Sequence, residues 1–108
     1  MKKIISLLSF ILLLSLRSSA QIVEASIKTS GQCEHCKSTI ENNIRFEKGV
    51  KKVTFDPNSH LVTVKYDATN TNIKNIQLAI TKLGYDADSL MADPKAYEKL
   101  SPCCKKPE

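Results

Sequence analysis

The chain has 108 residues, with 16 Lys or Arg and 11 Asp or Glu, so its formal net charge is +5. Three of the basic residues (Lys2, Lys3 and Arg17) lie among the first 20, and without them the net charge is only +2. No Lys/Arg stripe interleaved with aromatic residues occurs elsewhere. We therefore expect no nucleic-acid partner. The length suits one small domain.

The first twenty residues have the order of a secretory signal peptide. Two lysines precede an uncharged, mostly apolar run over residues 4–16, and the small residues Ser18-Ser19-Ala20 follow. The apolar run is shorter than the ~20 residues that a membrane-spanning helix needs. We predict a signal peptide over residues 1–20 that is removed after Ala20. The protein would then be exported, to the periplasm of a bacterium, with no stable membrane insertion.

The next elements follow from hydrophobic spacing. Residues 22–29 alternate between apolar and polar side chains, which predicts a half-buried strand. A helix is predicted over residues 36–47, where Cys36, Ile40 and Ile44 recur four apart, and Gly49 ends it. Strands over residues 50–56 and 61–67 are joined by a turn at residues 57–60, in which we expect His60 to be a surface residue.

A second helix is predicted over residues 72–83, with Thr71 or Asn72 as its N-cap. Residues 85–90 form a predicted last strand. The order of elements predicts an α+β, ferredoxin-like βαββαβ sandwich over residues 21–91. Residues 92–108 add a short helix, which begins at Asp93-Pro94, and a cysteine-containing tail.

All four cysteines follow the predicted signal peptide, in the close pairs Cys33/Cys36 and Cys103/Cys104. A disulfide within such a pair would remove little entropy from the unfolded chain, so the spacing favours binding something between the sulfurs. Cys36 lies in the first turn of a helix, where free N–H groups and the helix dipole favour the thiolate. Two thiolates suit soft ions such as Cu(I), and Zn(II) can use them with further ligands.

Three function classes remain open from the residues alone. The CxxC pair fits a soft-metal-binding protein, but CxxC also occurs in thiol–disulfide redox proteins. An even number of cysteines in an exported chain also fits a disulfide-stabilised interaction domain without metal.

The position of the CxxC pair, in the first strand-to-helix loop, resembles the heavy-metal-associated domain family over residues 22–90. Other segments that carry the resemblance are Gly49-Val50, Leu61-Val62-Thr63-Val64 and Leu83-Gly84-Tyr85-Asp86-Ala87. One departure is Ser30-Gly31-Gln32, where the family usually has Gly-Met-Thr or Gly-Met-Ser. A signal peptide followed by one such domain is most similar to the exported periplasmic mercury- and copper-binding members.

The resemblance implies a protein that is not an enzyme and that captures and transfers a metal ion. It implies Cys33 and Cys36 as the metal ligands, with Tyr85 near them. Its partner would be a protein that donates or accepts the ion, such as a membrane transporter. We expect Cu(I), with Hg(II) or Zn(II) as alternatives, and a monomer.

Three further residues are candidate ligands. His35 is either a third ligand or a solvated loop residue. The tail is long enough to return to the first cysteine pair, so Cys103 and Cys104 could add sulfur to the site. The alternative is a free tail, or one that forms a disulfide with a partner.

Overall fold

The computed structural model describes residues 20–106, so the predicted signal peptide lies outside the described residues except for Ala20. The division into signal peptide, domain and tail stays a prediction. The described elements, in chain order, are β1 (Ile22–Lys28), α2 (Glu34–Ile44), β2 (Val50–Asp56), β3 (Leu61–Asp67), α3 (Ile73–Lys82), α4 (Pro94–Glu98) and the 3-10 helix η1 (Pro102–Cys104). None of the helices within residues 20–106 is both long and apolar enough to cross a membrane.

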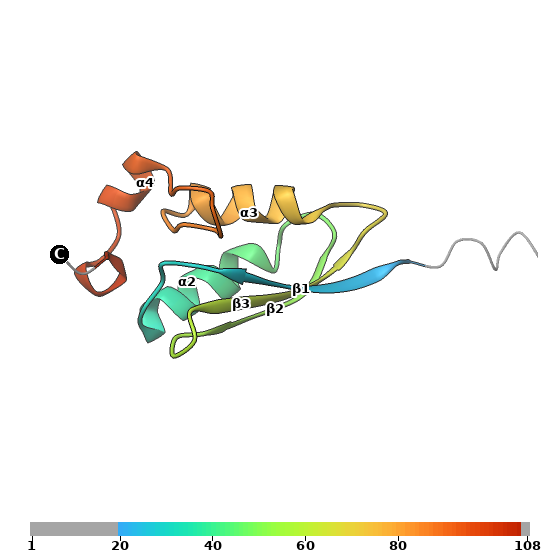
Figure 1. Cartoon of the computed structure of the whole chain (residues 1–108), viewed down its shortest axis with the longest axis horizontal. Helices are drawn as coiled ribbons and strands as arrows, with labels where there is room; N and C mark the ends of the chain where they lie inside the picture. The colour runs from blue at the N-terminus through green and yellow to red at the C-terminus, as the bar shows by residue number, and fades with distance from the viewer. Residues whose placement is uncertain (1–19, 107–108) are drawn as a thin grey trace, which may run out of the picture.

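The sheet is antiparallel with strand order β1-β3-β2, and both helices α2 and α3 lie on one side of it (Figure 1). The register places Val62 of β3 between Ile27 of β1 and Phe55 of β2. All three side chains are buried, and they pack with apolar residues of both helices. This face carries the core because strand side chains alternate between the two faces of a sheet.

The predicted helices are present, although the one predicted over residues 36–47 runs over Glu34–Ile44. On α2, Cys36, Ile40 and Ile44 point into the core. The side chain of Asn72 caps α3 by accepting a hydrogen bond of 2.9 Å from the backbone N–H of Asn75. Asp93 caps α4 through the N–H of Lys95, and Pro94 is its first residue.

The predicted last strand over residues 85–90 is not formed. Ala87 makes only isolated bridges, one to Thr29 and one to Leu90. Asp88 adopts a left-handed backbone (φ 52°), so the chain turns back here instead of running on beside β1. Its carboxylate accepts from the N–H of Lys28 at 2.9 Å, and this bond favours the turn over a strand. The α+β, ferredoxin-like fold class is confirmed, with a sheet of three strands.

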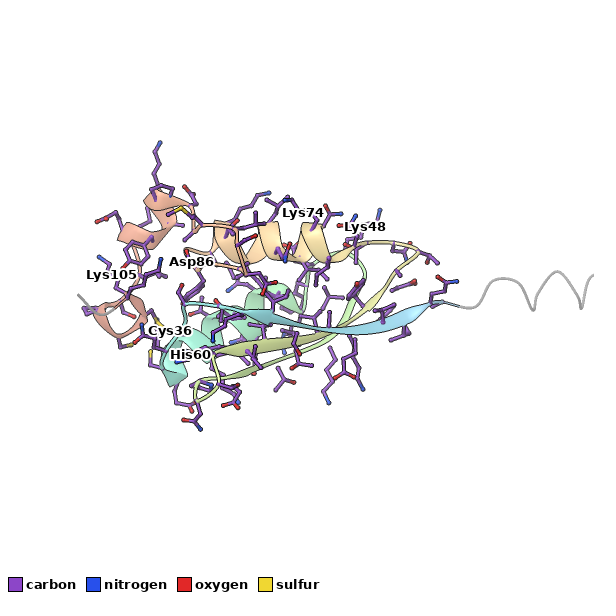
Figure 2. All side chains as sticks on the ribbon, viewed as in Figure 1. Cys36, Lys48, His60, Lys74, Asp86 and Lys105 are labelled. Carbon is purple, nitrogen blue, oxygen red and sulfur yellow. A yellow bond between two sulfur atoms is a disulfide. The ribbon has the colours of Figure 1, made fainter. Side chains whose placement is uncertain are left out.

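The topology gathers several connections at one end of the domain. The end of β1, the start of α2 and the β2–β3 turn meet there, and the tail returns to the same end. Figure 2 shows Cys36, His60 and Lys105 at this end, whereas Lys48 and Lys74 lie toward the other.

Candidate metal centre

The loop between β1 and α2 is held by backbone and side-chain contacts. A Cβ on Gly31 would lie 3.2–3.3 Å from side-chain atoms of Phe55, Cys36 and Ile40, so the loop packs directly on the core. His60 Nδ1 lies 2.8 Å from the carbonyl oxygen of Gly31. Because a carbonyl only accepts, Nδ1 carries the proton and donates it. The loop therefore reaches Cys33 in a fixed position.

His60 corrects an expectation from the sequence. It is half-buried rather than simply a surface residue, and its backbone oxygen also accepts from the N–H of Thr29 at 2.9 Å. Its left-handed backbone (φ 60°) aims the ring from the β2–β3 turn toward the loop. The only sequence signal was its place in a turn that the predicted topology brings to this end.

All four cysteine sulfurs meet at the N-terminus of α2. A disulfide joins Cys36 to Cys104, with a Cα–Cα distance of 5.8 Å, so it connects the two pairs instead of closing either one. The sulfur of Cys33 lies 3.2 Å from that of Cys36 and 3.5 Å from that of Cys104. The sulfur of Cys103 lies 4.0 Å from that of Cys104. The tail thus returns to the CxxC pair.

The two free cysteines differ in their acidity. Burial opposes ionisation of Cys33, yet the pKa of its thiol lies below the ordinary value, because Cys103 and the backbone N–H groups of Cys36 and His35 stabilise the thiolate. The same interaction with Cys33 raises the pKa of Cys103, and burial adds to it. The thiol of Cys33 is therefore the more acidic of the two.

Tyr85 lies beside the sulfurs, as the family resemblance implied. Its ring is fully buried, and its hydroxyl has no hydrogen-bond partner among the described residues. Burial raises the pKa of Tyr85, and the nearby sulfurs of Cys33 and Cys103 raise it further. The core cluster that contains Cys36 and Cys104 thus also contains a neutral O–H donor without an acceptor.

His35 is exposed and lies outside the group of ligand atoms close enough to share an ion. Within residues 20–106, the group whose ligand atoms all lie within 4.8 Å of one another is Cys33, Cys103 and Cys104. This donor set is all sulfur, which suits soft thiophilic ions and not hard ions such as Mg²⁺ or Ca²⁺.

The tail is placed by contacts that the sequence did not reveal. Gly84 has φ 106°, and a Cβ there would lie 2.9 Å from backbone atoms of Ala96, so the chain around α4 packs directly on this glycine. Asp86 forms an ion pair with Lys106. The hydroxyl of Tyr97 accepts from the N–H of Lys106 at 3.0 Å. Nothing in the sequence indicates this role of Gly84.

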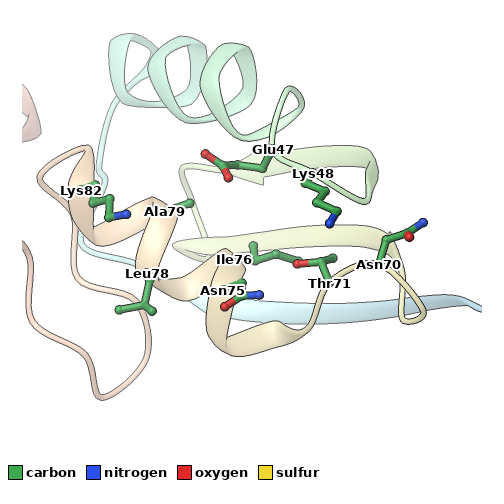
Figure 3. Close-up of a pocket in the computed structure, with 9 residues that line it drawn as sticks. All are labelled: Glu47, Lys48, Asn70, Thr71, Asn75, Ile76, Leu78, Ala79 and Lys82. Carbon is green, nitrogen blue, oxygen red and sulfur yellow. The ribbon is translucent and has the colours of Figure 1, made fainter.

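A separate hollow lies between α3 and the loop after α2 (Figure 3). Its volume is about 310 Å³, and residues such as Lys48, Asn75 and Lys82 line it. None of the nine residues that Figure 3 labels is a cysteine or a histidine, so the hollow is not part of the sulfur site.

Comparison with known proteins links this geometry to a family. The profile of the Heavy-metal-associated domain matches residues 32–86. The copper chaperone CopZ of Enterococcus hirae is 38% identical over 56 residues, which cover 52% of this chain and 81% of CopZ. The water-soluble region of the P-type ATPase CopA from Bacillus subtilis is 30% identical, with a TM-score of 0.59, over 64% of this chain and 46% of that region.

Oxidised MerP from Ralstonia metallidurans CH34 shares the fold at 22% identity, with a TM-score of 0.60 over 63% of this chain and 96% of MerP. The family profile covers half of the chain and includes both cysteines of the CxxC pair. The chain therefore belongs to the heavy-metal-associated domain family, as the sequence predicted.

Proposed function

We propose that this protein captures a soft metal ion through Cys33 and Cys36 and passes it to a partner by thiolate exchange. The observation that carries the proposal is the pair of sulfurs 3.2 Å apart at the N-terminus of α2. Thiolates are the preferred ligands of such ions, and the helix N-terminus favours their ionised form. The similarity to a copper chaperone supports the same reading.

Burial sets the direction of transfer. Cys36 is fully buried, whereas Cys33 is partly exposed. A partner thiolate would add to the bound ion from the exposed side and form a three-coordinate intermediate. The bond to Cys33 would then break, a second partner thiolate would add, and the bond to Cys36 would break last. The ion is never released to water in this sequence of steps.

We propose Cu(I) as the ion, because copper is named for CopZ, with Hg(II) and Zn(II) as the ions to compare. The similarity to part of the ATPase CopA supports a membrane transporter as partner. We also propose that the protein is exported to the periplasm and is a monomer. The proposal of export rests on the signal-peptide-like order of residues 1–20.

The test is titration of the reduced chain with Cu(I), without oxygen, against a chromophoric chelator. Replacing both Cys33 and Cys36 by Ser should weaken binding at least about a hundredfold, since two ligands are lost. His35→Gln is the matched control and should bind as the original chain does. Equal affinity of the double variant and the original would overturn the proposal.

A second candidate, thiol–disulfide exchange, is favoured by one observation. The sulfur of Cys33 lies 3.2 Å and 3.5 Å from the two sulfurs of the Cys36–Cys104 disulfide. Attack of the Cys33 thiolate on Cys36 would form a Cys33–Cys36 bond and release the Cys104 thiolate, with no net oxidation. A redox protein would speed the reduction of insulin by a dithiol. We expect no increase over the uncatalysed rate.

A further inference from the structure

The tail gives this protein two sulfurs that a CxxC pair lacks. We propose that, once a dithiol reductant has converted the Cys36–Cys104 disulfide to two thiols, all four cysteines bind one ion as a single thiolate centre. The dithiol supplies two electrons and two protons and becomes a disulfide itself. This inference rests on the proposed function and adds Cys103 and Cys104 to its ligands.

Sulfur spacing is the first support. With metal–sulfur bonds of about 2.3 Å, two sulfurs of a tetrahedral centre lie about 3.8 Å apart, whereas those of a linear two-sulfur site lie about 4.6 Å apart. The sulfur of Cys33 lies 3.2 and 3.5 Å from the two disulfide sulfurs, those of Cys36 and Cys104, and the Cys103–Cys104 separation is 4.0 Å. These values lie around the tetrahedral spacing and below the linear one.

The backbone of the tail allows both neighbouring cysteines to take part. In an extended chain, adjacent side chains point to opposite sides. Here η1 forms a tight turn, in which the N–H of Cys104 donates to the oxygen of Ser101 at 2.9 Å. In this turn the sulfurs of Cys103 and Cys104 both lie near that of Cys33, and all three are within 4.8 Å of one another.

Contacts other than the disulfide hold the tail in place. Gly84 accepts the close approach of Ala96, and Asp86 pairs with Lys106. The N–H of Asp86 also donates to the hydroxyl of Ser30 at 2.9 Å, so one residue connects the tail to the loop before Cys33. These contacts do not depend on the disulfide, so they still hold the tail on the domain after reduction.

The chemistry of the centre defines its ligand. Four thiolates around a divalent ion leave a net charge of −2, and Lys105 and Lys106 follow Cys104 directly. The centre suits a d¹⁰ ion that accepts four sulfurs, such as Zn(II) or Cd(II).

The experiment uses Cd(II) as the probe. One equivalent of ¹¹³Cd(II) is added to the reduced full chain without oxygen, and its chemical shift, which moves downfield with each thiolate ligand, is measured. We expect the shift of a four-sulfur centre and one ion per chain by native mass spectrometry. Because Cys103 is exposed, Cys103→Ser should fold normally. It should move the shift upfield and weaken Cd(II) binding at least about tenfold.

Three further variants separate this inference from the proposed function. Cys103→Ser/Cys104→Ser should bind Cd(II) at the remaining pair with a shift still further upfield, while Cys33→Ser/Cys36→Ser should lose most of the affinity. Lys74→Ala, at an exposed position toward the other end of the domain, keeps all four cysteines, so its shift at saturation should equal that of the original chain. An unchanged shift and affinity in Cys103→Ser would overturn the four-sulfur centre and leave the CxxC proposal standing. Unchanged affinity in Cys33→Ser/Cys36→Ser would overturn both.

Discussion

Reducing the Cys36–Cys104 disulfide should lower the free energy of unfolding of the metal-free chain by about 4 kcal/mol. The bond joins residues 68 apart in the sequence, and the loop it closes contains α2, the β2–β3 hairpin and α3. In the chain-entropy model, a loop of this length removes about 15 cal/mol/K from the unfolded state, which is about 4 kcal/mol at 25 °C. That is a large part of the stability of a small domain.

The assay is urea unfolding of the metal-free chain, followed by circular dichroism, with and without a phosphine reductant. Cys33→Ser/Cys103→Ser keeps the disulfide and has no free thiol for exchange, so it should show the full effect of reduction. Cys36→Ser/Cys104→Ser is the matched control and should unfold at the same urea concentration under both conditions. A change below about 1 kcal/mol in the first variant would refute the entropic argument.

A bound ion should replace the lost disulfide. An ion that binds only the folded state, at a free concentration a thousand times its Kd, adds about 4 kcal/mol to the free energy of unfolding. A soft ion at a free concentration about a thousand times its Kd should thus bring the reduced chain back to the stability of the oxidised one. The oxidised chain, with two of its four sulfurs in a disulfide, should gain much less from the same ion.

Three further predictions concern residues around the site and in the core. Tyr85→Phe removes a buried hydroxyl without a partner, so the free energy of unfolding of the metal-free chain should stay equal or rise by up to about 1 kcal/mol; a loss of 2 kcal/mol would contradict this. His60→Ala should cost about 1 kcal/mol through the lost hydrogen bond to Gly31, because His and Ala both bear the left-handed backbone. His60→Gly should cost less than His60→Ala, because glycine adopts this backbone without strain, as thermal unfolding can show. Hydrogen bonds from the side chain and backbone of Thr69 lower the pKa of Asp67, so the stability this carboxylate contributes is present above about pH 4 and lost as pH falls through its lowered pKa. Asp67→Asn should therefore be less stable than the original chain at pH 7, and urea unfolding should show the difference shrinking below pH 4.

The sequence predicted the regular elements well, because their signals are local. The strands over residues 50–56 and 61–67 have the predicted bounds, since alternation and the turn between them specify both. The last strand was wrong for a tertiary reason. Tyr85 and Ala87 alternate into the core as a strand would, but Asp88 bonds to Lys28 and turns the chain back. Alternation reports which side chains are buried, not whether the backbone pairs.

For the site, the sequence indicated the residues and left their connection open. Four cysteines allow three pairings into two disulfides, and spacing does not choose among them. The bond between Cys36 and Cys104 depends on tail docking, which depends on a contact between Gly84 and Ala96 that no local pattern encodes. The role of His60 is likewise visible only when the turn and the loop lie side by side.

The strength of tail docking bears on how an ion would be both held and released. A closed four-sulfur centre retains its ion, whereas transfer needs one face open to a partner thiolate. The contacts that hold the tail without the disulfide include the partly exposed Asp86–Lys106 pair, and such pairs contribute at most about 1 kcal/mol. The disulfide, in contrast, ties the tail covalently to Cys36. In the reduced chain the tail would thus open more often than in the oxidised chain. Cys103 and Cys104 would then leave the ion first, and a partner would meet it on Cys33 and Cys36. In the oxidised chain the tail is fixed over Cys36, which then has no thiolate to offer. On this reasoning the pairing of Cys36 with Cys104 decides whether the site can take up an ion, and the weaker contacts of the tail decide how readily it gives the ion up.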